Sequence, residues 1–225
     1  MTFAEMVRGK SVAVVGGSNL LEGIGQGEYI DSHDVVLRVN LHWPCPIFLE
    51  DQRDLSVDIG QRTDIVFQAV SAWRPGRFHQ MDIKLVIIRG NDRFVQDFLS
   101  HDTPTHWLHP MFLQILDDCE QRGTAVEYFS PKYDHIYPEW NPNTGLLALK
   151  TVMYEEPSKV YVAGFDFSVF HNRVVNWYHH DPLKDRQYFR NHIATDPRVE
   201  MHPIVRKAVE SDYVHPTFSP QIKMI

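Results

Sequence analysis

Two junctions between a predicted strand and a predicted helix combine glycine with small polar residues. Gly16–Asn19 (GGSN) follows the apolar run Val12–Val15, and Asn143–Gly145 (NTG) precedes the helical pattern of Leu146–Tyr154. Glycine lets the backbone turn sharply and approach a phosphate without a Cβ in the way. The N–H groups at a helix N-terminus also attract negative charge. Each junction could therefore bind a phosphate or a carboxylate, although a tight turn and a plain helix cap would explain the same residues.

A histidine pair further along the chain offers acid–base chemistry. His179 and His180 come directly before Asp181 and Pro182, an N-cap residue and a first helical residue. A neutral imidazole can take a proton from a hydroxyl group near pH 7. Because histidine pairs before helices are also common on protein surfaces, these residues alone leave a structural role open.

Short strands that alternate with helices must position these residues. The β-branched, apolar runs that predict strands are Ser11–Val15, Val35–Val39, Asp64–Val70, Lys84–Ile88, Val126–Phe129 and Lys159–Ala163. The segments with helical patterns are Met111–Arg122, Thr144–Tyr154 and Pro182–His192. Strands that are apolar on both faces, with helices between them, predict an α/β fold of Rossmann-like type, in which a mostly parallel sheet carries helices on both faces. Such sheets bind ligands outside the carboxyl ends of their strands.

The composition is typical of one soluble globular domain. With 225 residues and no repeat or linker, a single domain spanning 1–225 is expected. A net charge of −7 and the lack of a Lys/Arg run argue against a nucleic-acid partner. No apolar stretch approaches the roughly 20 residues that span a bilayer, and the N-terminal residues lack the apolar core of a signal peptide. Two cysteines, Cys45 and Cys119, make no disulfide framework and indicate a reducing, cytoplasmic compartment.

Dinucleotide and metal sites are not expected. Gly23, Gly25 and Gly27 follow a G-x-G-x-G spacing, whereas the dinucleotide fingerprint requires G-x-G-x-x-G directly after the strand. The sequence contains no D-x-D, the usual cation anchor of nucleotide-sugar transferases. His106 and His109 have no third ligand at a recognisable spacing. We therefore predict neither a cofactor nor a metal.

The segment after the first junction has a specific polar pattern. Ile30–Asn40 (IDSHDVVLRVN) places Asp, His, Asp, Arg and Asn at spacings that packing alone does not require. It resembles the end of the large sialylmotif of the eukaryotic-type sialyltransferases, glycosyltransferase family 29, whose pattern is I-D-x-H-D-x-V-x-R-x-N. Pro142–Gly145 and Val160–Phe165 resemble the small sialylmotif, in which P-x-T/S-G caps a helix and V-x-x-x-G-F ends the next strand. Asp58–Asp64 (DIGQRTD) is similar to the D-x-G-x-R/K-T segment between the two motifs.

This resemblance implies a glycosyltransferase with a variant of the GT-A type fold. The implied reaction moves sialic acid, or a related keto-sugar acid, from a CMP-activated donor to a glycan hydroxyl; it is inverting and metal-independent, with a histidine as general base. A CMP-Kdo-type transferase shares the leaving group and remains an alternative, as does a non-catalytic relative that only binds a nucleotide or a glycan. Residues 71–140, where acceptor specificity would differ, carry no readable motif.

The resemblance also assigns residues to roles. It makes His180 the catalytic base, with His179 as the competing candidate. His180 and Asp185 match the spacing of the family's H-x-x-x-x-E element, with Asp in place of Glu, so Asp185 is a supporting residue. Arg62 and Thr63 are equally expected to be structural or to line the cleft. The implied donor-binding residues are Gly17, Ser18, Asn19, Asn40, Asn143, Thr144, Gly145, Gly164 and Phe165.

Other parts of the resemblance concern support and variation. The segment that resembles the large sialylmotif is called the first motif below, and the two that resemble the small sialylmotif are together called the second motif. Internal hydrogen bonds and ion pairs are expected to hold the first motif through Asp31, His33, Asp34 and Arg38. The family's H-Y-Y element is not recognisable, and His171 or the pair Tyr178 and His179 would replace it. The less regular segment Leu41–Leu55 is expected to be a surface excursion near the cleft.

Golgi members of the family carry a membrane anchor and a disulfide that ties the two motifs together. Val12 and Glu155–Pro157 stand where those cysteines would be. The resemblance therefore implies a short, soluble relative of bacterial or viral style.

Overall fold

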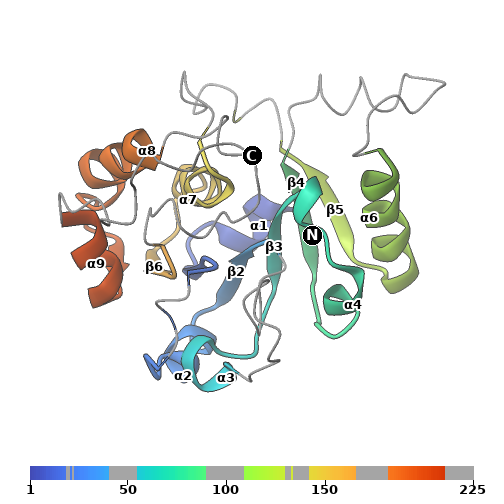
Figure 1. The fold of residues 1–225 in the computed structure, drawn as a ribbon, viewed down its shortest axis with the longest axis horizontal. Helices are drawn as coiled ribbons and strands as arrows, with labels where there is room; N and C mark the ends of the chain where they lie inside the picture. The colour runs from blue at the N-terminus through green and yellow to red at the C-terminus, as the bar shows by residue number, and fades with distance from the viewer. Residues whose placement is uncertain are drawn as a thin grey trace, which may run out of the picture.

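The computed structural model describes residues 1–18, 21, 23–40, 55–89, 109–129, 133, 142–165 and 182–210. Across these ranges one seven-stranded sheet forms, and all neighbouring strands are parallel (Figure 1). The strands are β1 (Ser11–Val15), β2 (Val35–Val39), β3 (Ile65–Ala69), β4 (Leu85–Arg89), β5 (Ala125–Tyr128), β6 (Lys159–Ala163) and β7 (Val199–Met201). Their order is β5-β4-β3-β2-β1-β6-β7, so the chain runs outward from β1 to β5 and then returns to the other side of β1.

Helices cover both faces of this sheet, as predicted. The helical segments of the described ranges are α1 (Phe3–Val7), α2 (Gly27–Asp31), α3 (Ser56–Ile59), η2 (Val70–Ala72), α4 (Pro75–Phe78), α6 (His109–Arg122), α7 (Thr144–Tyr154), α8 (Pro182–Tyr188), the π-helix η6 (Phe189–Ile193) and α9 (Pro203–Glu210). On one face, α1, α7, η6 and α9 pack against strand residues such as Val14 and Leu37. On the other face, α2 and α3 cover β1, β2 and β6, while α4 and α6 cover β3 and β4. Burial on both faces explains why the strands are apolar at every position.

Most predicted elements have the predicted bounds. β1, β2 and β6 match them, and β3, β4 and β5 differ by one residue at their ends. The predicted helix Thr144–Tyr154 is confirmed as α7, and Pro182–His192 is formed by α8 and η6 together. The sequence does not reveal β7, because three residues are too few to show the alternation of a strand.

None of the helices in the described ranges is both long enough and apolar enough to cross a membrane.

Non-covalent contacts occupy the places of the disulfide that the resemblance implied for Golgi relatives. Val12 pairs with Val160 in the parallel ladder between β1 and β6. Glu155, only 1% exposed at the end of α7, accepts a hydrogen bond from the Tyr133 hydroxyl and pairs with Arg8 NH2 at 2.8 Å. The two halves of the fold are thus joined here by a ladder and a buried carboxylate.

Candidate active site

The two motifs meet where β1 and β6 end. Gly16 N donates to Ala163 O at 2.9 Å, and Ser18 N donates to Gly164 O at 3.2 Å. A Cβ on Gly16 would lie 2.3 Å from Gly164 O, so only glycine allows the two chain segments to approach this closely. Gly164 has a φ of +73°, in the left-handed region that favours glycine. The sheet reverses its strand order between β1 and β6, and open α/β sheets bind ligands outside the strand ends at such a point.

Phe165 connects this junction to the start of α7. A Cβ on Gly145 would come within 2.5 Å of the Phe165 ring, and a Cβ on Gly16 would come within 3.2 Å of the same ring. Phe165 itself is 7% exposed and belongs to the apolar core. The described contacts of Gly145, Gly164 and Phe165 therefore join the two motifs to each other.

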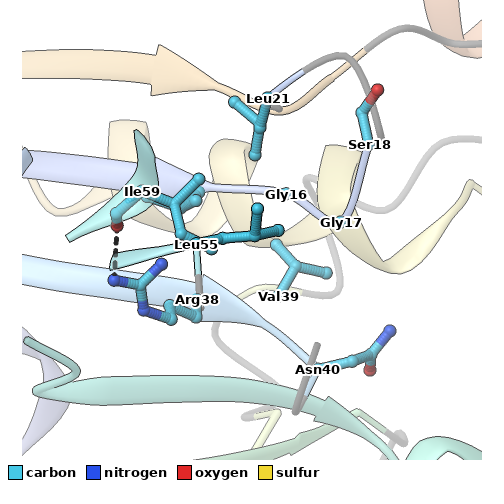
Figure 2. A pocket seen from close by; sticks show the side chains of 10 residues that line it. Gly16, Gly17, Ser18, Leu21, Arg38, Val39, Asn40, Leu55 and Ile59 are labelled. Atoms are coloured by element: carbon cyan, nitrogen blue, oxygen red, sulfur yellow. Dashed lines mark hydrogen bonds between the residues drawn. The ribbon is translucent and has the colours of Figure 1, made fainter. Parts of the chain in front are cut away.

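A pocket opens at the carboxyl ends of β1 and β2 (Figure 2). Its lining consists of Val15, Gly16, Gly17, Ser18, Leu21, Arg38, Val39, Asn40, Leu55 and Ile59. Three of the predicted donor-binding residues, Gly17, Ser18 and Asn40, lie here together. Figure 2 shows the side chains of Ser18 and Asn40 beyond the ends of the two strands, and Leu55 among the other side chains that line the pocket.

Asn40 has an unusual backbone conformation. Its φ of 59° lies in the left-handed region, which asparagine tolerates better than most residues. Asn40 N donates to Phe67 O at 2.9 Å, and the side-chain Oδ1 accepts from Ala69 N at 2.8 Å. Because Oδ1 faces the end of β3, the NH2 group lies on the other side of the amide. An amide NH2 is a hydrogen-bond donor, and Asn40 lines the pocket.

Arg38 supports the wall of the pocket and is almost fully buried, with 2% of its surface exposed. Its Nε donates to Thr63 Oγ1 at 2.9 Å, and its NH2 donates to Ile59 O at 2.7 Å (Figure 2). Burial lowers the pKa of Arg38 to about 9, and the charge of Asp31 acts in the opposite direction. The guanidinium is therefore charged at pH 7 and holds Ile59 in place.

Arg62 closes the turn after α2. Its guanidinium donates to the carbonyl oxygens of Asp31, His33 and Asp34 and to the carboxylate of Asp64, at distances from 2.7 to 2.8 Å. In return the Asp31 carboxylate accepts from Arg62 N at 3.0 Å. The internal hydrogen bonds expected for the first motif are thus present. These contacts favour the structural role of Arg62 over the cleft-lining one. The same holds for Thr63, whose Oγ1 accepts the hydrogen bond from Arg38 Nε.

Asp185 holds the second motif from α8. It is fully buried, and its Oδ2 accepts from Asn143 N at 2.9 Å. Asn143 in turn caps α7, because its Oδ1 accepts from Leu146 N at 2.8 Å. Asp185 therefore supports the turn that carries Asn143 and Thr144, two of the predicted donor-binding residues.

Arg89, the last residue of β4, also contacts this turn, and the sequence-based prediction did not include it. Its NH1 donates to Thr144 Oγ1 at 3.0 Å, and its NH2 donates to Pro142 O at 2.7 Å. No motif marks residues 71–140, but Arg89 directly follows the predicted strand Lys84–Ile88. A charged residue at the carboxyl end of a parallel strand is the signal that could have identified it.

Several predicted residues lie outside the described ranges. These are the candidate bases His179 and His180, the donor-binding residue Asn19, and His171, Tyr178, Asp181, His106 and Cys45. The segment predicted as a surface excursion also lies outside them, except for Leu55. Within the described ranges, no group of three or more His, Cys, Asp or Glu residues could hold a metal ion.

Comparisons with known proteins agree with the motifs. The model of glycosyltransferase family 29 (sialyltransferase) matches residues 5–206. A crystal structure of a mammalian sialyltransferase aligns with a TM-score of 0.55 and 17% sequence identity, covering 86% of this chain and 68% of that chain. A second, of a mammalian sialyltransferase in complex with Gal-beta-1-3GalNAc-ortho-nitrophenol, aligns with a TM-score of 0.54 and 17% identity, covering 89% of this chain and 71% of that chain. At this identity the structural likeness establishes the fold, and no curated protein matches the sequence.

Proposed function

Because the chain belongs to glycosyltransferase family 29, the sialyltransferases, we propose that it transfers sialic acid from a CMP-activated donor to a hydroxyl group of a glycan. The observation that carries this proposal is the meeting of both motifs at the ends of β1 and β6, where Gly16 lies against Gly164. The parallel sheet is then a variant of the GT-A type.

The proposed donor has two anionic groups, the phosphate of CMP and the carboxylate of sialic acid. Ser18 and the NH2 group of Asn40 offer hydrogen-bond donors at the pocket. The first N–H groups of α7, from Thr144 and Gly145, have no acceptor within the helix and lie at the positive end of its dipole. These two sets of hydrogen-bond donors lie at the same edge of the sheet, where the carboxyl ends of the strands are, and this suits a ligand with two anionic groups.

We propose an inverting displacement. The acceptor hydroxyl oxygen attacks the anomeric carbon of sialic acid while the bond from that carbon to the phosphate oxygen breaks, and CMP leaves with the electron pair. A histidine takes the hydroxyl proton; His180 is the proposed base and His179 the alternative. The hydrogen-bond donors near the phosphate stabilise the charge of the leaving group, so that no metal is required.

The buried contact of Asp185 supports a working site over a non-catalytic relative. Aspartate stands where the family's H-x-x-x-x-E element has glutamate, and its shorter side chain reaches Asn143 N at 2.9 Å. The turn that would face the donor is therefore held in place despite the replacement.

Calorimetric titration tests the donor site. EDTA-treated protein should bind CMP and should not bind UDP or NADH. A transfer assay with CMP-sialic acid and CMP-Kdo then identifies the sugar, and Gal-β-1-3-GalNAc is the first acceptor to try because a structure of a mammalian relative contains its nitrophenol derivative. Lack of CMP binding, or binding only with a divalent ion, would contradict the proposal.

The proposed base is tested by substitution. His180→Ala should abolish transfer and leave the Kd for CMP near that of the unmodified protein, while His179→Ala should keep measurable transfer. If His180→Ala also lost CMP binding, His180 would hold the donor or the fold instead of acting as the base.

A further inference from the structure

The turn before α7 is fixed from several directions by residues that lie far away in the sequence. Asp185 binds the N–H of Asn143, and the Phe165 ring lies against Gly145. Arg89 reaches the same turn from the end of β4, with one bond to a backbone oxygen, Pro142 O, and one to a side chain, Thr144 Oγ1. The second bond concerns a group that could itself contact a ligand.

The bond from Arg89 determines what the Thr144 hydroxyl can do. A hydroxyl group has one hydrogen to donate and lone pairs that accept. Since Oγ1 accepts from the Arg89 guanidinium, its own hydrogen must point elsewhere. Thr151 shows the usual alternative within the same helix, because its hydroxyl donates to Leu147 O one turn earlier at 2.8 Å. Thr144 is the first residue of α7, so the helix has no preceding turn whose carbonyl could accept its hydrogen.

Two physical effects favour an anionic acceptor for that hydrogen. A hydrogen bond from a guanidinium is charge-assisted, and it polarises the hydroxyl that accepts it, which makes the hydroxyl a stronger donor. The start of α7 also carries the positive end of the helix dipole. The positive charge of Arg89 lies at the same place and itself attracts an anion.

We propose that Arg89 is a positioning residue of the donor site, which turns the Thr144 hydroxyl into a hydrogen-bond donor for the phosphate or carboxylate of the sugar nucleotide. This inference rests on the proposed function. It differs from a merely structural role, in which Arg89 would only brace the turn through Pro142 O.

Substitutions at both ends of the contact separate these roles. Arg89→Gln removes the charge, Arg89→Lys keeps the charge without the two-pronged geometry, and Thr144→Val removes the hydroxyl while leaving Pro142 O untouched. Arg122→Gln is the matched control, because the Arg122 guanidinium also makes two bonds, to His79 O at 2.7 Å and Met81 O at 3.1 Å, far from the donor site. Each variant is measured for its Tm and for its Kd for CMP and CMP-sialic acid by calorimetry.

Arg89→Gln and Thr144→Val should each weaken binding of CMP-sialic acid by about tenfold or more, the size of effect that one charge-assisted hydrogen bond produces. Thr144→Ser should retain the affinity. In the Arg89→Gln background, Thr144→Val should add little further loss, because the two residues act through one contact. Arg122→Gln should change the Tm and leave the Kd unaltered.

Two results would overturn the inference by itself. Unchanged affinity in Arg89→Gln would leave Arg89 with a bracing role only, and additive losses in the double variant would separate its role from that of Thr144. If Arg89→Gln does not fold, the same comparison of affinities is made with Arg89→Lys, alone and in combination with Thr144→Val. Failure of the unmodified protein to bind CMP would instead overturn the proposed function, and the role of Arg89 with it.

Discussion

Substitution of Gly164 by alanine tests the contact on which the candidate site is built. Two costs combine at this position. The φ of +73° is unfavourable for any residue with a Cβ, by about 1–2 kcal/mol. The new Cβ would also lie 2.6 Å from Gly16 O and 2.6 Å from Leu21 Cδ1. A backbone oxygen cannot rotate away, so β1 and β6 must separate, and such overpacking costs about 1–3 kcal/mol.

The chain contains a control for the first of these costs. Gly123, after α6, has a φ of +65°, and nothing lies within 4 Å of a Cβ built there. Gly123→Ala should therefore lose about 1–2 kcal/mol from the backbone conformation alone. Gly164→Ala should lose about 3 kcal/mol, which for a domain of this size lowers the Tm by roughly 6–12 °C.

Thermal and urea unfolding of both variants measure the difference, and calorimetry with CMP follows its effect on the site. Gly164→Ala should bind CMP more weakly than Gly123→Ala, because displacement of Gly16 moves the first motif. Equal stability losses in the two variants would refute the reasoning. They would mean that the close approach of β1 and β6 tolerates a methyl group.

Further predictions concern charged side chains. Asp185→Ala should lose about 1.5–3 kcal/mol of stability and weaken CMP binding. Asp185→Asn can still accept from Asn143 N and should lose less. Equal losses of stability and of CMP affinity in the two variants, measured by urea unfolding and calorimetry, would argue against the contact. Arg62→Gln should lower the Tm without changing the Kd for CMP, and a weaker Kd would reinstate its cleft-lining role. Burial lowers the pKa of Lys150, whose Nζ lies 4.2 Å from the Tyr188 ring centroid, to about 8. Unfolded lysine keeps its proton up to about pH 10, so the unfolded state binds more protons between these values and the free energy of unfolding should rise with pH from about 8 to 10. In urea unfolding at pH 7.5 and 9.5, Lys150→Met should lack this rise, and identical pH dependence of the two proteins would contradict it.

The sequence predicts the sheet well because the pattern of its strands is local. The run that forms β1 is apolar at each position from Val12 to Val15, and burial on both faces of a parallel sheet demands this. The same rule brings Gly16 and Gly164 to one edge, since each directly follows a strand. The sequence does not predict β7 in this way, because the strand has only three residues and the first two are half-buried.

The contacts of the candidate site were harder to predict because they cross between elements. The bond between Arg89 and Thr144 exists only because α7 packs back across β2 and β3, so that its first residue reaches the end of β4. Asp185 was identified by its spacing from His180, but the spacing says nothing about its partner, Asn143 N. The sequence left open whether Arg62 has a structural role or lines the cleft, because this depends on where the carbonyl groups of the turn after α2 lie. The described contacts of Arg62 favour the structural role.

The order of the strands also determines when the candidate site can form while the chain is being synthesised. β1 emerges before its neighbour β6, which comes from a distant part of the sequence, since Ser11 faces Lys159 in the ladder. Until β6 has left the ribosome, β1 is an open edge of a partial sheet, with unpaired backbone groups that invite wrong partners. Pairing over such a distance is slow. The contact between Gly16 and Gly164 is then among the last to form, so a nascent chain can hold much of its sheet and still have no place for a ligand.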